Sequence, residues 1–162
     1  MTASDYFECA RLSARELREA VTELATLEEA DEQCVPWHPR SDSGAASPGA
    51  HGDPTASAAE ARIQDLGRMI SARREAVAEL RAVVRECQEV VAGIGAACGL
   101  RRSRVVSLYY VDLADTWSEV ARELGVSLRT VYSDRDAAFE WLDAMGVSGA
   151  RAAALAAEKI DA

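Results

Sequence analysis

Arginine and hydroxyl side chains gather in two short stretches of the C-terminal half of the sequence. The first is a basic cluster of Arg101, Arg102 and Arg104, and the second runs from residue 127 to residue 135. Arginine donates paired hydrogen bonds to a guanine edge or a phosphate, and hydroxyl groups bond to phosphates and base edges. These residue types therefore predict contact with duplex DNA. In the second stretch the candidate contacts are Ser127, Arg129, Thr130, Tyr132, Ser133 and Arg135.

The candidate contacts divide into readers of sequence and binders of the backbone, and each role has a structural alternative. Arg129 is the candidate base reader, whereas Arg135 and the basic cluster are candidate phosphate contacts. Arg129 could instead be a solvated residue at the start of a helix. Ser127 could serve as a helix cap, and Tyr132 could pack on the preceding helix. The basic cluster could form salt bridges with acids of the long helix that precedes it.

Three short helices are predicted to position these side chains. They cover residues 100–111, 117–124 and 128–145, with a turn over residues 112–115. Thr116 followed by Glu119 is a capping pair, Gly125 suits a turn with positive φ, and Ser127 suits an N-cap. Small Ala121 allows close approach of the last two helices. The buried corner between them is predicted from Val120, Leu124, Val126 and Val131, and Ala138, Phe139 and Leu142 continue the inner face.

The N-terminal half is predicted to be a helical hairpin or coiled coil. One helix is expected over residues 4–33, and a second over residues 57–98 with Ser57 as its cap. The second carries apolar residues three and four apart, which is typical of a coiled-coil seam. The first helix could cover this seam within one chain, or the uncovered part could pair with another chain. Its positions are Ile63, Leu66, Ile70, Arg73, Val77, Leu80, Val84, Cys87, Val91, Ile94 and Cys98, where Arg73 alone is polar.

A stretch over residues 35–56 holds all four prolines of the chain, and its composition predicts a flexible connector. Its only large apolar side chain is Trp37, which could pin the connector to a helix or lie exposed. The spacing of Cys34, His38 and His51 fits no usual zinc pattern, so no metal or other cofactor is expected. The complete division is residues 1–34, 35–56, 57–98, 99–146 and a C-terminal tail over 147–162.

Composition and charge restrict the class of function. No phosphate-binding loop, nucleophile elbow or HExxH motif is present, so the chain is predicted not to be an enzyme. No apolar run is long enough to span a membrane and the N-terminus is unlike a signal peptide, which predicts a cytoplasmic protein. The net charge of −9 argues against DNA binding. However, residues 1–34 carry −6 of it and residues 99–146 only −2.

Residues 104–142 resemble region 4 of bacterial sigma factors. The resemblance rests on Glu119-Val120-Ala121, on Leu124 to Ser127, on Thr130-Val131 and on Ala138-Phe139. Nearly the whole chain is similar to small phage-encoded transcriptional activators of the RinA and ArpU type, which have helical N-terminal regions and a loop resembling the Gly52–Ser57 segment. One departure is Asp134, where sigma-like modules often place an apolar residue. It implies a different rotation of the third helix or a carboxylate at its edge, near the expected DNA face.

Together these features predict an all-α transcriptional regulator of phage type that binds double-stranded DNA. It is expected to act as a homo-oligomer through residues 63–98, because joining two weak modules raises their effective affinity. The resemblance also implies contact with RNA polymerase. Two alternatives remain: a phage assembly or DNA-packaging adaptor, and a protein-interaction module that does not bind DNA.

Overall fold

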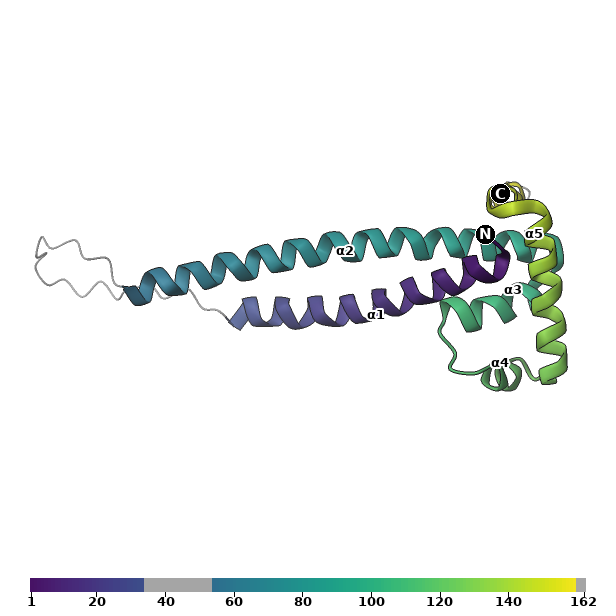
Figure 1. Cartoon of the computed structure of the whole chain (residues 1–162), viewed down its shortest axis with the longest axis horizontal. Helices are drawn as coiled ribbons and strands as arrows, with labels where there is room; N and C mark the ends of the chain where they lie inside the picture. The colour runs from purple at the N-terminus through teal and green to yellow at the C-terminus, as the bar shows by residue number, and fades with distance from the viewer. Residues whose placement is uncertain (34–53, 160–162) are drawn as a thin grey trace, which may run out of the picture. The chain divides into compact units, whose positions relative to one another are not determined.

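The protein is all α-helical. The computed structural model describes residues 1–33 and 54–159, and these residues contain no β-strand. Cys34 and residues 35–53 of the predicted connector, with Trp37, His38 and His51, lie outside the described residues. The elements are α1 (Ala3–Gln33), α2 (Pro54–Cys98), α3 (Leu100–Val106), the π-helix η1 (Ser107–Val111), α4 (Trp117–Leu124) and α5 (Leu128–Glu158), as labelled in Figure 1.

The two long helices have nearly the predicted bounds. α1 begins one residue before the predicted Ser4, and α2 ends at Cys98 as predicted. The prediction that Ser57 caps α2 is wrong, because the helix begins at Pro54. Proline is well tolerated in the first turn of a helix, where its missing N–H group would have no partner inside the helix. Residues 54–56, assigned to the connector from their composition, therefore belong to α2.

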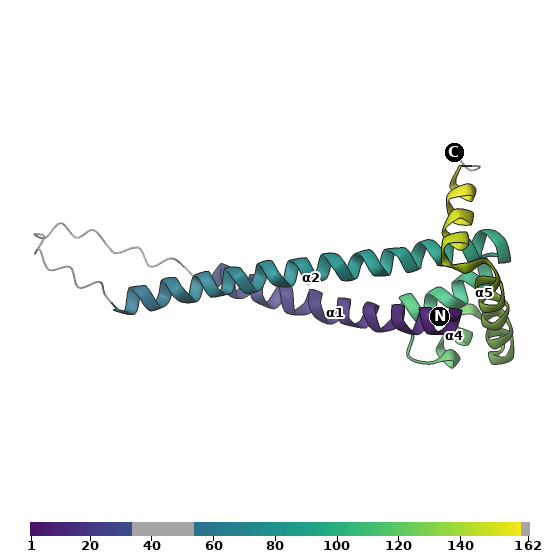
Figure 2. The ribbon, with the colours of Figure 1, turned by 45° about the horizontal axis from the view of Figure 1, so that its top comes forward.

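The chain divides into two compact units, and α1 and α2 contribute to both. One unit comprises residues 19–77, and within it the two helices run antiparallel and side by side in Figures 1 and 2. Its buried apolar side chains are Ala20, Ile70 and Val77. Exposed ion pairs join the two helices: Arg74 lies 2.7 Å from Glu28, and Arg73 pairs with Glu23.

The other unit comprises residues 1–18 and 78–162. Phe7 of α1 is fully buried among aromatic rings, with centroids 5.3 Å from Tyr110 and 5.4 Å from Phe139. On the α2 side of this core lie Cys87, Val90, Val91 and Ile94. Burial raises the pKa of the Cys87 thiol to about 12, so this side chain behaves as the small apolar group that its seam position predicted.

The coiled-coil seam is partly buried within one chain. Of its eleven positions, Ile70, Val77, Cys87, Val91 and Ile94 are buried, and Leu66, Arg73, Leu80, Val84 and Cys98 are half-buried. The single chain thus covers part of the seam, and pairing of the rest with another chain stays a prediction. At its N-terminal end the seam remains open, since Ile63 is 39% exposed.

The C-terminal helices follow the predicted order with two differences. The helix predicted over residues 100–111 is α-helical only to Val106 and continues as the π-helix η1. α5 extends beyond the predicted end at Met145, to Glu158, and is broken at Gly146, where φ is 71°. The bend is visible close to the C-terminus in Figure 2. Residues 147–158, assigned to a tail from sequence, thus form helix.

This last part of α5 crosses α2 at very close range. A Cβ atom placed on Gly93 would lie 2.0 Å from the carbonyl oxygen of Ala150, so only glycine fits at the crossing. Ala150 is fully buried, and Arg151 forms an ion pair of 2.7 Å with Glu89 of α2. The crossing anchors the C-terminal turns to the second long helix.

Among the described residues, no helix combines the length and the apolar character that crossing a membrane requires.

Candidate nucleic-acid interface

The turn between α4 and α5 has the local structure that its sequence predicts. The hydroxyl of Thr116 accepts a hydrogen bond of 3.2 Å from the backbone N–H of Glu119 and so caps α4. Gly125 ends α4 in the left-handed region, with φ of 65°. Ser127 caps α5 by accepting a 3.1 Å bond from the N–H of Thr130. These caps fix where α5 begins and hence which residues its first turns present.

A small apolar cluster holds α4 against α5. Val120 and Val131 are fully buried, and Ala121 is nearly so. Leu124 at the end of α4 and Val126 in the turn pack against them, as predicted. Val105 of α3 and Leu108 of η1 complete the cluster. Since Val131 points into this cluster, neighbouring positions of α5 must point outward.

Three of the predicted contacts are exposed on the first turns of α5. Arg129 and Ser133 lie at the surface, and Tyr132 is 37% exposed. Within the described part of the chain, Arg129 forms no ion pair. Thr130 is half-buried, and its hydroxyl lies 2.8 Å from the hydroxyl of Ser127, so both hydroxyl groups contribute to the cap. Arg129, Tyr132 and Ser133 are thus the predicted contacts on α5 that are exposed and take no part in its cap.

Tyr132 and Arg135 belong to a stack of rings and guanidinium groups. The Arg135 guanidinium lies 5.1 Å from the ring centroid of Tyr132 and 5.4 Å from that of Trp117. Arg135 also pairs with Asp136 at 2.6 Å. The Tyr132 ring lies 6.1 Å from that of Trp117 in α4, centroid to centroid, which supports the packing alternative, while its exposed fraction leaves DNA contact as a prediction. Arg135 is only 27% exposed, and its contacts restrain it.

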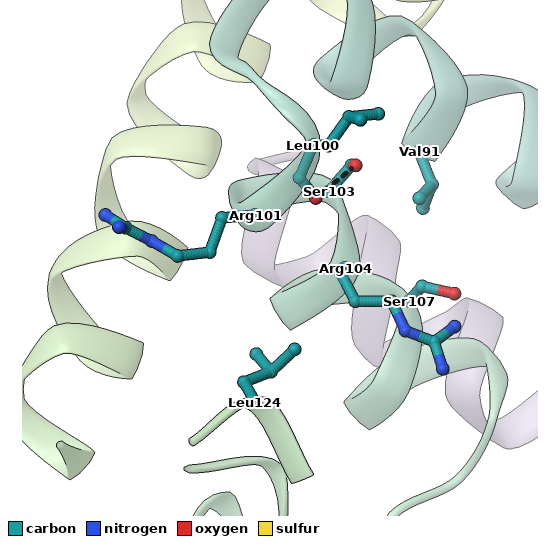
Figure 3. A pocket seen from close by; sticks show the side chains of 7 residues that line it. All are labelled: Val91, Leu100, Arg101, Ser103, Arg104, Ser107 and Leu124. Carbon is teal, nitrogen blue, oxygen red and sulfur yellow. Dashed lines mark hydrogen bonds between the residues drawn. The ribbon is translucent and has the colours of Figure 1, made fainter. Parts of the chain in front are cut away.

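Each arginine of the basic cluster forms at least one ion pair. Arg101 donates two hydrogen bonds to Asp134 of α5, of 2.6 Å from Nε and 3.1 Å from Nη2. Arg102 approaches the same carboxylate at 3.6 Å. Hydrogen bonds and the charge of Asp134 raise the pKa of Arg101 further above its ordinary value. In Figure 3 the side chain of Arg101 extends toward α5, away from that of Arg104.

Arg104 has different partners. Its guanidinium lies 3.4 Å from Asp112 after η1 and 3.1 Å from Glu123 of α4. With Arg101 it borders an open hollow of about 470 Å³, whose apolar lining comes from Val91, Leu100 and Leu124. The three arginines of the cluster therefore face different acids, with Arg101 and Arg102 toward Asp134 and Arg104 toward Asp112 and Glu123.

One alternative about charge is wrong. The basic cluster does not form salt bridges to acids on the long second helix, since the partners Asp112, Glu123 and Asp134 all follow α3. Asp134, the departure from the sigma-like pattern, is only 4% exposed and pairs with Arg101 of the neighbouring helix α3. The carboxylate is turned inward, where the two arginines of α3 satisfy it, so α5 does not present it to solvent.

One residue that positions this region was missed at the sequence level. Arg11 of α1 is 4% exposed, and its guanidinium donates to the carbonyl oxygens of Tyr109 and, at 2.9 Å, of Ala114. It also stacks on the Tyr109 ring at 3.8 Å, and that ring stacks on Trp117 at 3.7 Å. Arg11 thus ties α1 to the segment between η1 and α4. The available signal was its spacing, because Arg11 lies one helical turn after Phe7 and one turn before Ala14.

Metal-ligating side chains do not cluster in the part of the chain that the structure describes. No three histidine, cysteine, aspartate or glutamate residues among residues 1–33 and 54–159 come together as a metal site would require. In this region Asp112, Glu123, Asp134 and Asp136 form ion pairs with arginine. The predicted contacts that remain exposed on α5 offer a guanidinium, a hydroxyl and an aromatic ring, in Arg129, Ser133 and Tyr132.

Comparison with known protein families, curated proteins and solved structures finds no match to the chain.

Proposed function

We propose that the protein is a sequence-specific DNA-binding transcriptional regulator of the phage type, which reads duplex DNA with the first turns of α5. The observation that carries the proposal is that these turns have one buried and one exposed face. Val131 is buried against α4, while Arg129, Tyr132 and Ser133 face outward from a capped helix start. The N-terminal part of such a helix is the part that enters a major groove. Because residues 104–142 resemble sigma region 4, the proposal extends to contact with RNA polymerase.

The test is a fluorescence anisotropy titration of a preferred and a scrambled duplex, repeated across salt concentrations. Arg129→Ala should cost about 1–3 kcal/mol on the preferred duplex and much less on the scrambled one. Arg62→Ala, which removes an exposed arginine of α2, is the matched control and should change neither affinity. A wild-type chain that binds no duplex at low salt would refute the proposal.

Self-association through residues 63–98 is part of the proposal. Because five of the seam positions are already buried in the single chain, the contact would use side chains of α2 that remain exposed, chiefly Ile63, Met69 and Val83. Sedimentation of the wild type and of an Ile63→Ser, Met69→Ser double variant tests it. The variant should dissociate to the 17.4 kDa chain. A large ring would instead favour the assembly or DNA-packaging adaptor.

The engaged arginines and the net charge of −9 favour a second candidate, a protein-interaction module. Ion pairs with Asp112, Glu123 and Asp134 reduce the positive potential that DNA would meet. This candidate would have the hollow beside Leu100, which is 82% exposed, as a contact surface. Salt-sensitive duplex binding separates the two candidates, because a pure protein-interaction module would show none.

A further inference from the structure

Asp134 is a buried carboxylate in an otherwise apolar row of α5. The inward positions before and after it, Val131, Ala138 and Leu142, are buried and apolar. The side chain of Asp134 is 5% exposed and accepts two hydrogen bonds from Arg101, while Arg102 stands 3.6 Å away. Removing a carboxylate from water is costly, and a well-packed apolar side chain is often as stabilising as a buried ion pair. Stability of the fold alone therefore does not account for an acid at this position.

The geometry of the ion pair suggests another role. A guanidinium has five N–H donors, and Arg101 uses its Nε–H and one Nη2–H on Asp134, so three remain. The Arg101 side chain is 60% exposed and that of Arg102 is 41% exposed. Two guanidinium groups share one carboxylate, which leaves one positive charge in excess at the surface. The carboxylate also removes rotamer freedom that these long side chains would otherwise lose on binding.

We infer that Asp134 is a positioning residue, which holds Arg101 and Arg102 in place to bind a backbone phosphate of duplex DNA. This inference rests on the proposed function and assigns a role to a residue outside the exposed face of α5. Arg101 contacts the phosphate directly, and Asp134 contributes by orienting the Arg101 guanidinium. Charge-assisted hydrogen bonds from an oriented guanidinium to phosphate are stronger and more directional than those from a freely rotating one.

Electrostatics and positioning make opposite predictions for the loss of this carboxylate. Asp134→Asn removes a negative charge close to the proposed phosphate, so charge alone predicts tighter binding. Positioning predicts weaker binding, because Arg101 loses the acceptor that orients it. Glu140→Gln is the matched control, since Glu140 is an exposed acid on the same helix and the substitution changes the charge by the same amount. It should leave the affinity unchanged or raise it slightly.

The experiment uses the full chain and a fluorescently labelled mixed-sequence duplex, titrated across salt concentrations. We expect Asp134→Asn to bind about tenfold more weakly, with a salt dependence shallower by about one unit. Arg101→Ala should have a similar effect, and the Asp134→Asn, Arg101→Ala double variant should lose little more than either single variant. Circular dichroism and thermal melting verify that each variant is folded at the assay temperature.

Arg101→Lys tests the same contact if Asp134→Asn does not fold. Lysine keeps the charge but cannot make the forked contact with Asp134, so binding should still weaken. If the wild-type chain binds the duplex and either Asp134→Asn or Arg101→Lys binds it at least as tightly, the inference is overturned and the proposed function is not. Additive losses in the double variant overturn it as well, because Asp134 would then not act through Arg101. A wild-type chain that binds no duplex overturns the proposed function and this inference together.

Discussion

Residues 19–77 and the unit formed by residues 1–18 and 78–162 are built from the same kind of helix but bury different side chains. The first unit buries small and aliphatic groups such as Ala20 and Ile70, and exposed ion pairs border them. The second buries an aromatic core around Phe7, and it also buries two charged residues, Arg11 and Asp134.

This difference indicates which unit has the more strictly defined geometry. A two-helix contact of aliphatic side chains fixes a pairing, but it tolerates many substitutions of similar volume. A buried charge must have its partner in place, because an unpaired one costs several kcal/mol. The unit that carries the proposed DNA contacts is therefore the one whose geometry is fixed by individual polar contacts. The predictions below test this contrast.

The largest effect is expected at the aromatic core. Phe7→Ala should destabilise the protein by about 3–5 kcal/mol, because the cavity between Tyr110 and Phe139 cannot close. Ile70→Ala in the other unit should cost about 2 kcal/mol, at the low end for such a change, since a two-helix contact can relax. Denaturant unfolding measures both variants. Near-ultraviolet circular dichroism follows the aromatic core around Phe7, and far-ultraviolet circular dichroism follows the loss of helix in both units. Equal losses at the two positions would contradict the contrast.

The buried arginine should come next. Arg11→Met keeps most of the volume but leaves the carbonyl oxygens of Tyr109 and Ala114 without their donor, at a cost of about 2 kcal/mol. Arg15→Met, an exposed arginine one turn further along α1, is the control and should be nearly neutral. Thermal melting of both variants provides the comparison. An effect of Arg11→Met no larger than that of the control would show that these carbonyl groups find other partners.

The sequence predicted helices and caps better than it predicted contacts. The bounds of α4, the caps Thr116 and Ser127 and the positive φ of Gly125 all follow from local rules, because each depends on residues only a few positions apart. The long seam likewise follows from periodicity. The start of α2 is the exception, because the helix begins three residues before the capping signature at Ser57, with Pro54 tolerated in its first turn.

Contacts between distant segments were beyond the sequence. Nothing local to Arg11 indicates that Tyr109 and Ala114 will accept its hydrogen bonds, and nothing local to Asp134 identifies Arg101 as its partner. The anomaly of an acid on an apolar face was visible, but its resolution needed the position of α3. The helix over residues 147–158 was missed because Gly146 interrupts the preceding pattern. Its alanines favour a helix, and its contact with Gly93 of α2 holds it in place.

A third prediction concerns the crossing of α2 and the last part of α5. Gly93→Ala should cost about 1–3 kcal/mol, because the new methyl group would overlap the backbone of Ala150. Gly67→Ala is the matched control in the other unit, since a Cβ atom there meets nothing within 4 Å. It should stabilise the helix by up to about 1 kcal/mol. Hydrogen exchange of residues 147–158 should quicken in Gly93→Ala alone, and unchanged exchange there would refute the tight crossing.

The smallest effect is expected at the exposed ion pairs of residues 19–77. Arg74 donates hydrogen bonds of 3.0 and 2.7 Å to Glu28, yet its side chain is 64% exposed. Water and salt screen such a pair, and ordering two long side chains costs entropy, so Arg74→Ala should change the free energy of unfolding by less than about 1 kcal/mol. Arg11, which is buried, is thus expected to contribute more to the free energy of unfolding than the exposed Arg74. Chemical denaturation at low and high salt measures this, because a screened pair loses its small contribution as salt rises. A loss as large as that of Arg11→Met, insensitive to salt, would mean that Glu28 and Arg74 fix the pairing of α1 with α2 rather than merely bordering it.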